Sequence, residues 1–271
     1  ISRGKKSEQL RHDRETLIER MGHHFINNTV TAINKQQQTL TLATGEQLCY
    51  DHLVVAIGSD SLITKVVGAK EYAIPFNNIA DAEKASLQLQ RLDSLNLPER
   101  PITLIGASIE GLEILGEIIR RYERQWRFKV TVIDSEPVLL KKYQGLDAFI
   151  KQQCKHLNIN WMLGNKVVEV CKDKVILDNG TVLNSRLTLW CGGAKPHSLL
   201  TSAELANNHR YAASRYTLQS IAAPNIWLAG DCLELPHPIA KQAYFALPMG
   251  KLVAENIYRS QHSKTLKVFR A

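Results

Sequence analysis

Short apolar runs that lead into glycine recur along the chain, with polar stretches between them. Such runs are typical of parallel strands that approach a ligand at their carboxyl ends. We expect strands of this kind at residues 53–57, 102–105, 186–190 and 225–229, which lead into Gly58, Gly106, Gly192 and Gly230.

Segments with helical spacing of their apolar residues lie between these runs. The spacing predicts helices at residues 8–21, 80–95, 109–124, 146–157 and 240–258. Shorter strands are expected at 29–33, 39–43, 167–171 and 174–177. The alternation of strands and helices predicts the α/β class.

A strand, a glycine turn and a helix follow one another at residues 102–113. Gly106 permits the sharp turn, Gly111 lets the helix pack closely on the strand, and the helix N-terminus offers amides and positive dipole to a pyrophosphate. Ser108 stands at the second glycine of the GxGxxG pattern, where its hydroxyl would either crowd the pyrophosphate or donate to it. The segment predicts a dinucleotide site; the alternative is a βαβ unit that binds nothing at this turn.

An acidic residue stands where the adenosine ribose is expected. The strand at residues 128–133 leads into Asp134, roughly 20 residues beyond Gly111, the spacing at which a carboxylate meets the ribose hydroxyls. This carboxylate repels a 2′-phosphate, and Glu136 adds to the repulsion. The sequence therefore predicts NADH over NADPH.

Composition and charge argue against several classes of protein. With 271 residues and 44% hydrophobic content, the chain can bury one large core or two domains. The longest apolar runs are far shorter than the roughly 18 to 20 residues of a membrane span, so we expect a cytoplasmic protein. The net charge of +8 comes from scattered basic residues without an aromatic platform, so nucleic acid is not expected. Five cysteines without CxxC or metal-ligand spacing predict reduced thiols and no metal site.

Four motifs resemble, in order, those of the FAD-dependent pyridine nucleotide-disulfide oxidoreductase superfamily. Residues 50–59 resemble its YDxLVxATGS, with Ile57 at the usual threonine, and residues 106–113 resemble its GGGxxGxE. Residues 190–196, which include Gly193, are similar to its second ATG-like motif, and residues 226–231 resemble its YAxGD. The closest resemblance is to members like the type II NADH dehydrogenases or the rubredoxin and ferredoxin reductases.

The resemblance implies a Rossmann-like NAD(H)-binding domain at residues 98–217, inserted in a partial FAD-binding Rossmann-like domain at residues 1–97 and 218–271. It implies FAD and NAD(H) as cofactors, with Gly58 and Gly230 at the FAD site and Asp231 bonded to the flavin ribityl chain. Glu113 would lie beside the nicotinamide as the catalytic residue. The alternatives are an ordinary solvated Glu113 and an Asp231 that only forms a turn.

The resemblance begins part-way into the family's first domain. The N-terminal strand and GxGxxG helix that hold the FAD pyrophosphate in the family have no counterpart in this sequence, and neither has the cysteine pair of the disulfide reductases. We expect a fragment of a longer protein; the alternative is a chain that has lost ordinary FAD binding.

The electron acceptor is predicted from the resemblance of residues 238–257 to other proteins. This helix is similar to the one at which the flavin meets quinone in type II NADH dehydrogenases, and to that of rubredoxin and ferredoxin reductases. We therefore expect an NADH-dependent flavoprotein oxidoreductase with a quinone-like acceptor, cytoplasmic or peripheral to a membrane. The alternatives are a reductase of a small electron carrier and a non-catalytic nucleotide-binding module.

Overall fold

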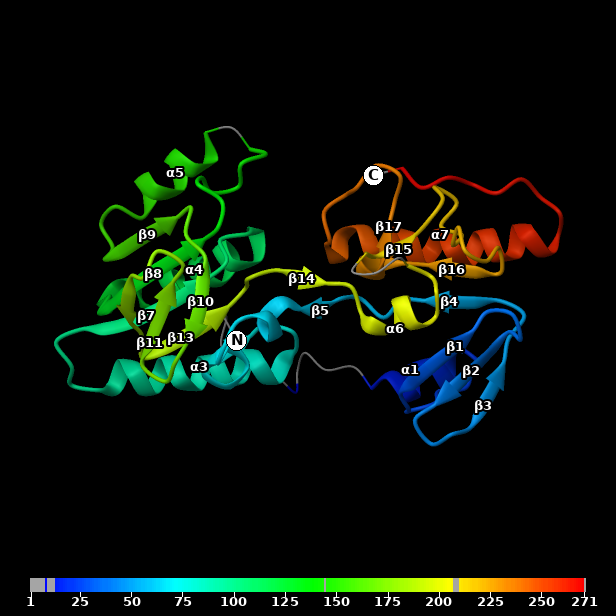
Figure 1. Ribbon diagram of the computed structural model, residues 1–271, viewed down its shortest axis with the longest axis horizontal. Coiled ribbons are helices and arrows are strands. Elements are labelled where there is room, and N and C mark those ends of the chain that lie inside the picture. Colours follow the sequence, from blue (N-terminus) through cyan, green and yellow to red (C-terminus); the bar gives the residue numbers. More distant parts are fainter. Residues whose placement is uncertain (1–7, 9–12, 144, 207–209, 271) are drawn as a thin grey trace. The chain divides into compact units, whose positions relative to one another are not determined.

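The computed structural model describes residues 8, 13–143, 145–206 and 210–270. Its contacts divide the chain into two compact units, unit 1 (Ser61–Gly193, with Asp13 from the N-terminal segment) and unit 2 (Arg14–Asp60 with Ala194–Ala271). Unit 1 is therefore inserted in unit 2, and both mix helices with strands (Figure 1). The predicted α/β class is confirmed.

Unit 1 is built on a five-stranded parallel sheet in the order β6-β13-β7-β8-β9 (Figure 1). Its strands are β6 (Ala73–Pro75), β7 (Arg100–Ile105), β8 (Phe128–Asp134), β9 (Ile159–Leu163) and β13 (Leu187–Trp190). Ile105 pairs with both Ile133 and Trp190, so the carboxyl ends of the three central strands are level.

The two faces of this sheet have different covers, because side chains alternate along each strand. Leu104, Val132 and Leu189 share a core with buried residues of α3 and α4. Ile105, Ile133 and Trp190 share another core with the antiparallel sheet β10-β11-β12. The elements of these covers are α3 (Ile79–Ser94), α4 (Ile109–Tyr122), α5 (Leu146–Gln153), β10 (Val167–Val170), β11 (Lys174–Leu177), β12 (Val182–Asn184), α2 (Ala69–Tyr72), η2 (Leu62–Lys65) and η3 (Glu123–Gln125).

Unit 2 contains an antiparallel sheet β1-β2-β3 and small parallel sheets. Its core surrounds the fully buried Trp227 and includes Met249 and Val253 of the long helix α7. Its elements are α1 (Arg14–Arg20), β1 (Val30–Asn34), β2 (Thr39–Leu42), β3 (Gln47–Cys49), β4 (Leu53–Val55), α6 (Ser198–Ser202), β15 (Ala212–Ala213), β16 (Ile226–Leu228), η4 (Gly230–Cys232), β17 (Leu233–Glu234) and α7 (Ala243–Gln261). A further two-stranded sheet joins β5 (Asp60–Ser61) and β14 (Ala194–Lys195).

The unit boundaries differ from the predicted domain boundaries at residues 98 and 217. Residues 61–97 group with unit 1 because β6 pairs with β13 and α3 packs on the parallel sheet. Residues 194–217 group with unit 2, where β15 pairs with β17. The assignment of one nucleotide to each domain stays a prediction.

The predicted strand at residues 53–57 is shorter and more exposed than its apolar run suggests. Strand β4 ends at Val55 and pairs, among the described strands, with β16 alone. Val54 is 44% exposed and Ile57 is 40% exposed. The parallel pairing is as expected, but β4 has no second neighbour among the described strands and so is not central in its sheet. Of the predicted first helix, α1 covers Arg14–Arg20, and residues 9–12 lie outside the described residues.

Candidate dinucleotide site

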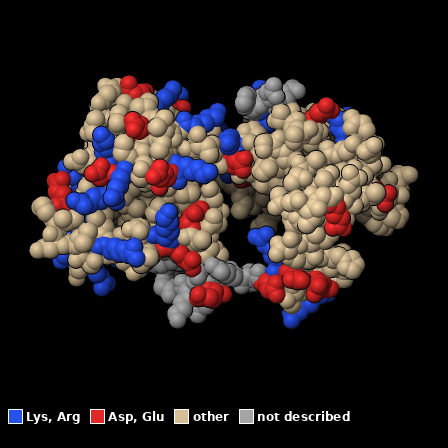
Figure 2. Space-filling view, turned by 60° about the horizontal axis from the view of Figure 1, so that its bottom comes forward, with Lys and Arg blue, Asp and Glu red and all other residues tan. Residues whose placement is uncertain are grey.

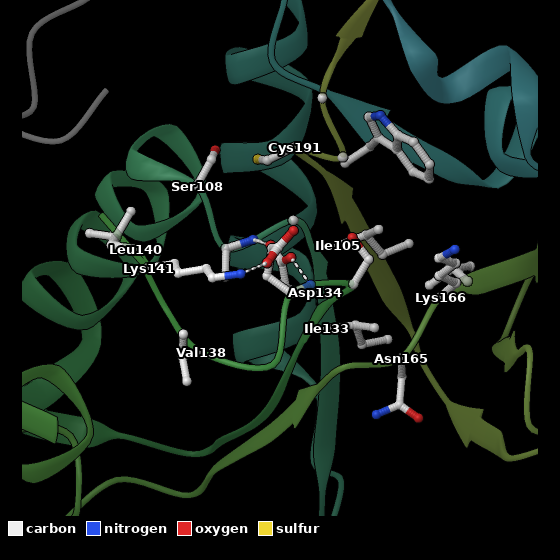
Figure 3. Close-up of a pocket in the computed structure, with 18 residues that line it drawn as sticks. Ile105, Ser108, Ile133, Asp134, Val138, Leu140, Lys141, Asn165, Lys166 and Cys191 are labelled. Carbon is white, nitrogen blue, oxygen red and sulfur yellow. Dashed lines mark hydrogen bonds and ion pairs between the residues drawn. The ribbon is translucent and has the colours of Figure 1, made fainter. Parts of the chain in front are cut away.

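A cavity of about 530 Å³ opens at the carboxyl ends of β7, β8 and β13 in unit 1 (Figure 3). Gly106, Ser108, Asp134 and Gly193 all line it, so four of the residues that the sequence singles out meet at one place. The carboxyl ends of strands in an open parallel sheet are where such folds bind ligands.

The turn between β7 and α4 leaves no room for a side chain at Gly106. Its φ is +96°, and a Cβ atom would lie 2.2 Å from the carbonyl oxygen of Cys191. A Cβ atom on Gly111 would lie 2.0 Å from the carbonyl oxygen of Gly106. Both glycines therefore hold the first turn of α4 tightly against the strand ends, as the sequence predicts for a phosphate-binding turn.

Ser108 occupies the N-cap position of α4 without capping the helix through its side chain. Its backbone is extended (φ −63°, ψ 176°), its side chain makes no capping hydrogen bond, and the residue is exposed at the cavity. The first amides of an α-helix have no partner within the helix. The N-terminus of the 14-residue α4 thus offers N–H groups and positive dipole to an anion.

Asp134 fastens the glycine turn to the end of β8. Its Oδ2 atom accepts a hydrogen bond from the Ala107 amide at 2.6 Å, and its Oδ1 atom accepts one from the Glu136 amide at 2.8 Å. Each carboxylate oxygen has a second lone pair, so ribose hydroxyls can share it. The structure thus gives Asp134 a loop-holding role that the sequence did not predict.

The wall of the cavity next to the glycine turn comes from residues 190–193, whose backbone approaches Gly106 closely. Gly193 has a φ of +93°, and its carbonyl accepts a hydrogen bond from the Leu62 amide. Trp190 is 5% exposed, and its buried indole N–H has no hydrogen-bond partner in the described structure. Burial, helped by the charge of Glu110, raises the pKa of the Cys191 thiol to about 12, so this thiol is neutral near pH 7. This part of the wall therefore carries no thiolate near pH 7.

Lys141, Asn165 and Lys166 also line the cavity, and the sequence analysis did not single them out. They lie on connections that follow β8 and β9, outside any motif. In the view of Figure 3, the two lysines lie on opposite sides of Asp134.

Glu113 does not line this cavity. It is an exposed residue of α4 that lines a separate apolar groove of about 560 Å³ beside α3. Its proposed place beside a nicotinamide stays a prediction.

Gly58, Gly230 and Asp231 belong to unit 2. Gly58 and Gly230 have φ values of +67° and +73°, so each turn uses a conformation that favours glycine. The cavity that Gly230 and Asp231 line measures about 10 Å³, the space of about one water molecule and too small for a flavin ring.

A half-buried lysine, Lys241, also lines this small cavity. Lys241 donates to the carbonyl of Leu233, and its Nζ atom lies 4.0 Å from the centroid of the Tyr211 ring. Burial lowers the pKa of Lys241, and the negative charge of Asp231 opposes that shift. The lysine and Asp231 thus compensate each other's charge within unit 2.

Three further features would point to other kinds of site: a metal site, a membrane-spanning helix and a patch of one charge. The described residues contain no group of three or more histidine, cysteine or acidic side chains placed to hold a metal ion. None of the helices in the described part of the chain has the length and apolar character of a membrane span. Basic and acidic side chains are interspersed on the face shown in Figure 2.

The fold is that of a Rossmann-type α/β protein, and comparison with known proteins gives the family. Residues 3–250 match the family model of the pyridine nucleotide-disulphide oxidoreductases, to which the chain belongs. It is 26% identical to ferroptosis suppressor protein 1 of Taeniopygia guttata over 92% of this chain and 66% of that protein. It is 21% identical to a type II NADH:quinone oxidoreductase of Staphylococcus saprophyticus, over 92% of this chain and 68% of the relative.

Solved structures agree on the fold. A ferredoxin reductase from Rhodopseudomonas palustris superposes with a TM-score of 0.81 at 18% identity, covering 98% of this chain and 65% of that one. The chain thus spans about two thirds of the length of the relatives it matches.

Proposed function

We propose that the chain is the nucleotide-binding part of an NADH-dependent flavoprotein oxidoreductase, which passes hydride from NADH to FAD and electrons to a quinone-like acceptor. The observation that carries the proposal is the unit 1 cavity, where two glycines that tolerate no Cβ atom bring a helix N-terminus to the strand ends. Membership of the pyridine nucleotide-disulphide oxidoreductases supports the same reading.

NADH fits the residues that are present. The glycine turn and the N-terminus of α4 would hold the pyrophosphate, and the acidic end of β8 would meet the adenosine ribose. Gly193 would form the wall beside the glycine turn, where its lack of a side chain lets the nucleotide approach the backbone. Glu113 would orient the nicotinamide end from the next turn of α4.

FAD is proposed because the chain belongs to this family. When bound, its flavin accepts hydride at N5. The motif residues Gly58, Gly230 and Asp231 would contact it. The cavity at Gly230 and Asp231 does not by itself fit a flavin ring, so no step of the mechanism is derived through its position.

The acceptor is proposed from the relatives. A type II NADH:quinone oxidoreductase among them supports a quinone, and a cytoplasmic place with peripheral membrane contact would suit that acceptor. The fold similarity to a ferredoxin reductase supports a second candidate, a reductase of a small electron-carrier protein.

The test is the visible absorption spectrum of the purified chain, recorded anaerobically before and after NADH is added. A flavin spectrum that bleaches supports the proposal, and reoxidation by a water-soluble quinone or by ferredoxin then separates the two acceptors. A colourless protein that binds NADH favours a nucleotide-binding module without turnover. A protein that binds neither FAD nor NADH contradicts the proposal.

A further inference from the structure

The segment that follows β8 is held in place by backbone hydrogen bonds. Besides the two amides bound by the Asp134 side chain, the Gly164 amide donates to the carbonyl of Glu136 and the Asn165 amide donates to the carbonyl of Asp134. Residues 134–136 are thus tied both to the glycine turn and to the connection after β9. The backbone at Glu136 is therefore held in place beside the cavity.

The Asp134 carboxylate is turned inward by these bonds, whereas the Glu136 carboxylate is not. Glu136 lines the cavity with its side chain 59% exposed, and its Oε2 atom lies 3.9 Å from Nζ of Lys141, which is 72% exposed. No backbone amide of the described residues binds the Glu136 side chain. Glu136 is therefore the carboxylate that presents its negative charge to the cavity rim.

The charges that line the cavity are balanced. Asp134 and Glu136 contribute two negative charges, and Lys141 and Lys166 contribute two positive charges. Loss of the Glu136 charge would leave two lysines against one carboxylate whose oxygens already accept backbone amides. A cavity with that surplus would attract the 2′-phosphate that distinguishes NADPH from NADH.

We propose that Glu136 is the specificity-determining residue of this cavity: by occupying Lys141 and presenting a negative charge, it excludes a 2′-phosphate, while Asp134 mainly holds the glycine turn. This inference rests on the proposed binding of NADH. It assigns to the Glu136–Lys141 pair the discrimination that sequence spacing alone assigns mainly to Asp134.

The test measures the dissociation constants of NADH and NADPH for the whole chain by the quenching of tryptophan fluorescence or by calorimetry. Glu136→Gln is expected to tighten NADPH binding about tenfold more than it tightens NADH binding, because NADPH alone carries the 2′-phosphate. The gain is expected to shrink as salt is raised, since the groups are exposed. Glu136→Gln with Lys141→Gln is expected to lose the gain.

Glu99 provides a matched control. Its side chain is also 59% exposed and pairs with Lys129, at 3.0 Å, at the amino-terminal ends of β7 and β8. Glu99→Gln removes the same charge from the same unit and is expected to leave the NADPH constant unchanged.

The outcomes separate this inference from the proposed function. NADH binding by the unsubstituted chain, with no gain of NADPH binding in Glu136→Gln, overturns the inference alone. An equal gain in Glu99→Gln, or an unsubstituted chain that prefers NADPH, also overturns it. An unsubstituted chain that binds neither nucleotide overturns the inference together with the proposed function.

Discussion

Units 1 and 2 each carry a glycine turn followed by a carboxylate, yet the two turns differ in structure. In unit 1 a Cβ atom on Gly106 or Gly111 would collide with backbone, and the turn borders a cavity of about 530 Å³. In unit 2 a Cβ atom on Gly230 would meet only the Cβ of Ala246 at 3.4 Å, and the adjoining cavity measures about 10 Å³. Similar motifs therefore occur once at a tightly packed glycine turn beside a large cavity and once at a less crowded turn beside a cavity the size of a water molecule.

The largest expected effect comes from adding a side chain at the tightly packed glycine turn of unit 1. Gly111→Ala places a methyl group 2.0 Å from the Gly106 carbonyl oxygen, so α4 must move away from the strand ends. We expect a loss of about 3 kcal/mol or more in the free energy of unfolding, measured by urea titration with tryptophan fluorescence. NADH binding is expected to disappear in the same variant.

Gly116, on the same helix, is the matched control. A Cβ atom there meets nothing within 4 Å. Gly116→Ala is expected to raise the free energy of unfolding by about 0.5–1 kcal/mol, because alanine is the better helix former, and to leave NADH binding unchanged. Equal effects of the two substitutions would show that the close approach at Gly111 is not needed.

The two carboxylates provide the next contrast. Asp134→Ala removes two hydrogen bonds to backbone amides and the expected contact to ribose, so NADH affinity should fall about tenfold to a hundredfold. Asp231→Ala, in unit 2, should leave the NADH dissociation constant unchanged. Fluorescence titration measures the NADH dissociation constant of both variants. An unaltered dissociation constant in Asp134→Ala would show that Asp134 does not belong to the site.

Smaller effects are expected at the glycines of unit 2. Gly58→Ala and Gly230→Ala each put an alanine at a positive φ without a backbone collision. The expected loss in the free energy of unfolding is about 1–2 kcal/mol for each, the ordinary cost of the left-handed conformation. A loss as large as that of Gly111→Ala, measured under the same urea conditions, would remove the contrast between the two turns.

Local patterns were sufficient to predict the centre of the site. The bounds of α4 and β8 follow from helical and strand periodicity, and Gly106, Ser108 and Asp134 line one cavity because consecutive parallel strands end at the same sheet edge. The predicted nucleotide turn needed only residues that are close in sequence.

Features that depend on distant pairing were missed. The edge strand β6 joins the sheet through β13, which lies far along the chain, and is too short to give a periodic signal. Strand β9, which was also not predicted, pairs with β8, the strand of this sheet that precedes it. The predicted boundary at residue 98 followed the prolines near it, although α3, which precedes them, packs on the sheet that follows. Lys166 reaches the cavity only because β9 lies beside β8.

The smallest expected effect concerns the cysteines of the two units. Burial raises the pKa of Cys191 in the unit 1 cavity to about 12, so at pH 8 almost none of it is thiolate, whereas Cys49 in unit 2 is exposed. Since the thiolate is the reactive form, iodoacetamide should label Cys49 well before Cys191, and Cys191 should react faster as the pH rises toward 12 in protein that stays folded. Peptide mapping by mass spectrometry measures both rates, with unfolded protein as the control in which the difference disappears. Equal rates in folded protein at pH 8 would mean that the cavity wall at Cys191 opens to solvent, and the tightly packed glycine turn that distinguishes unit 1 from unit 2 would then not persist in solution.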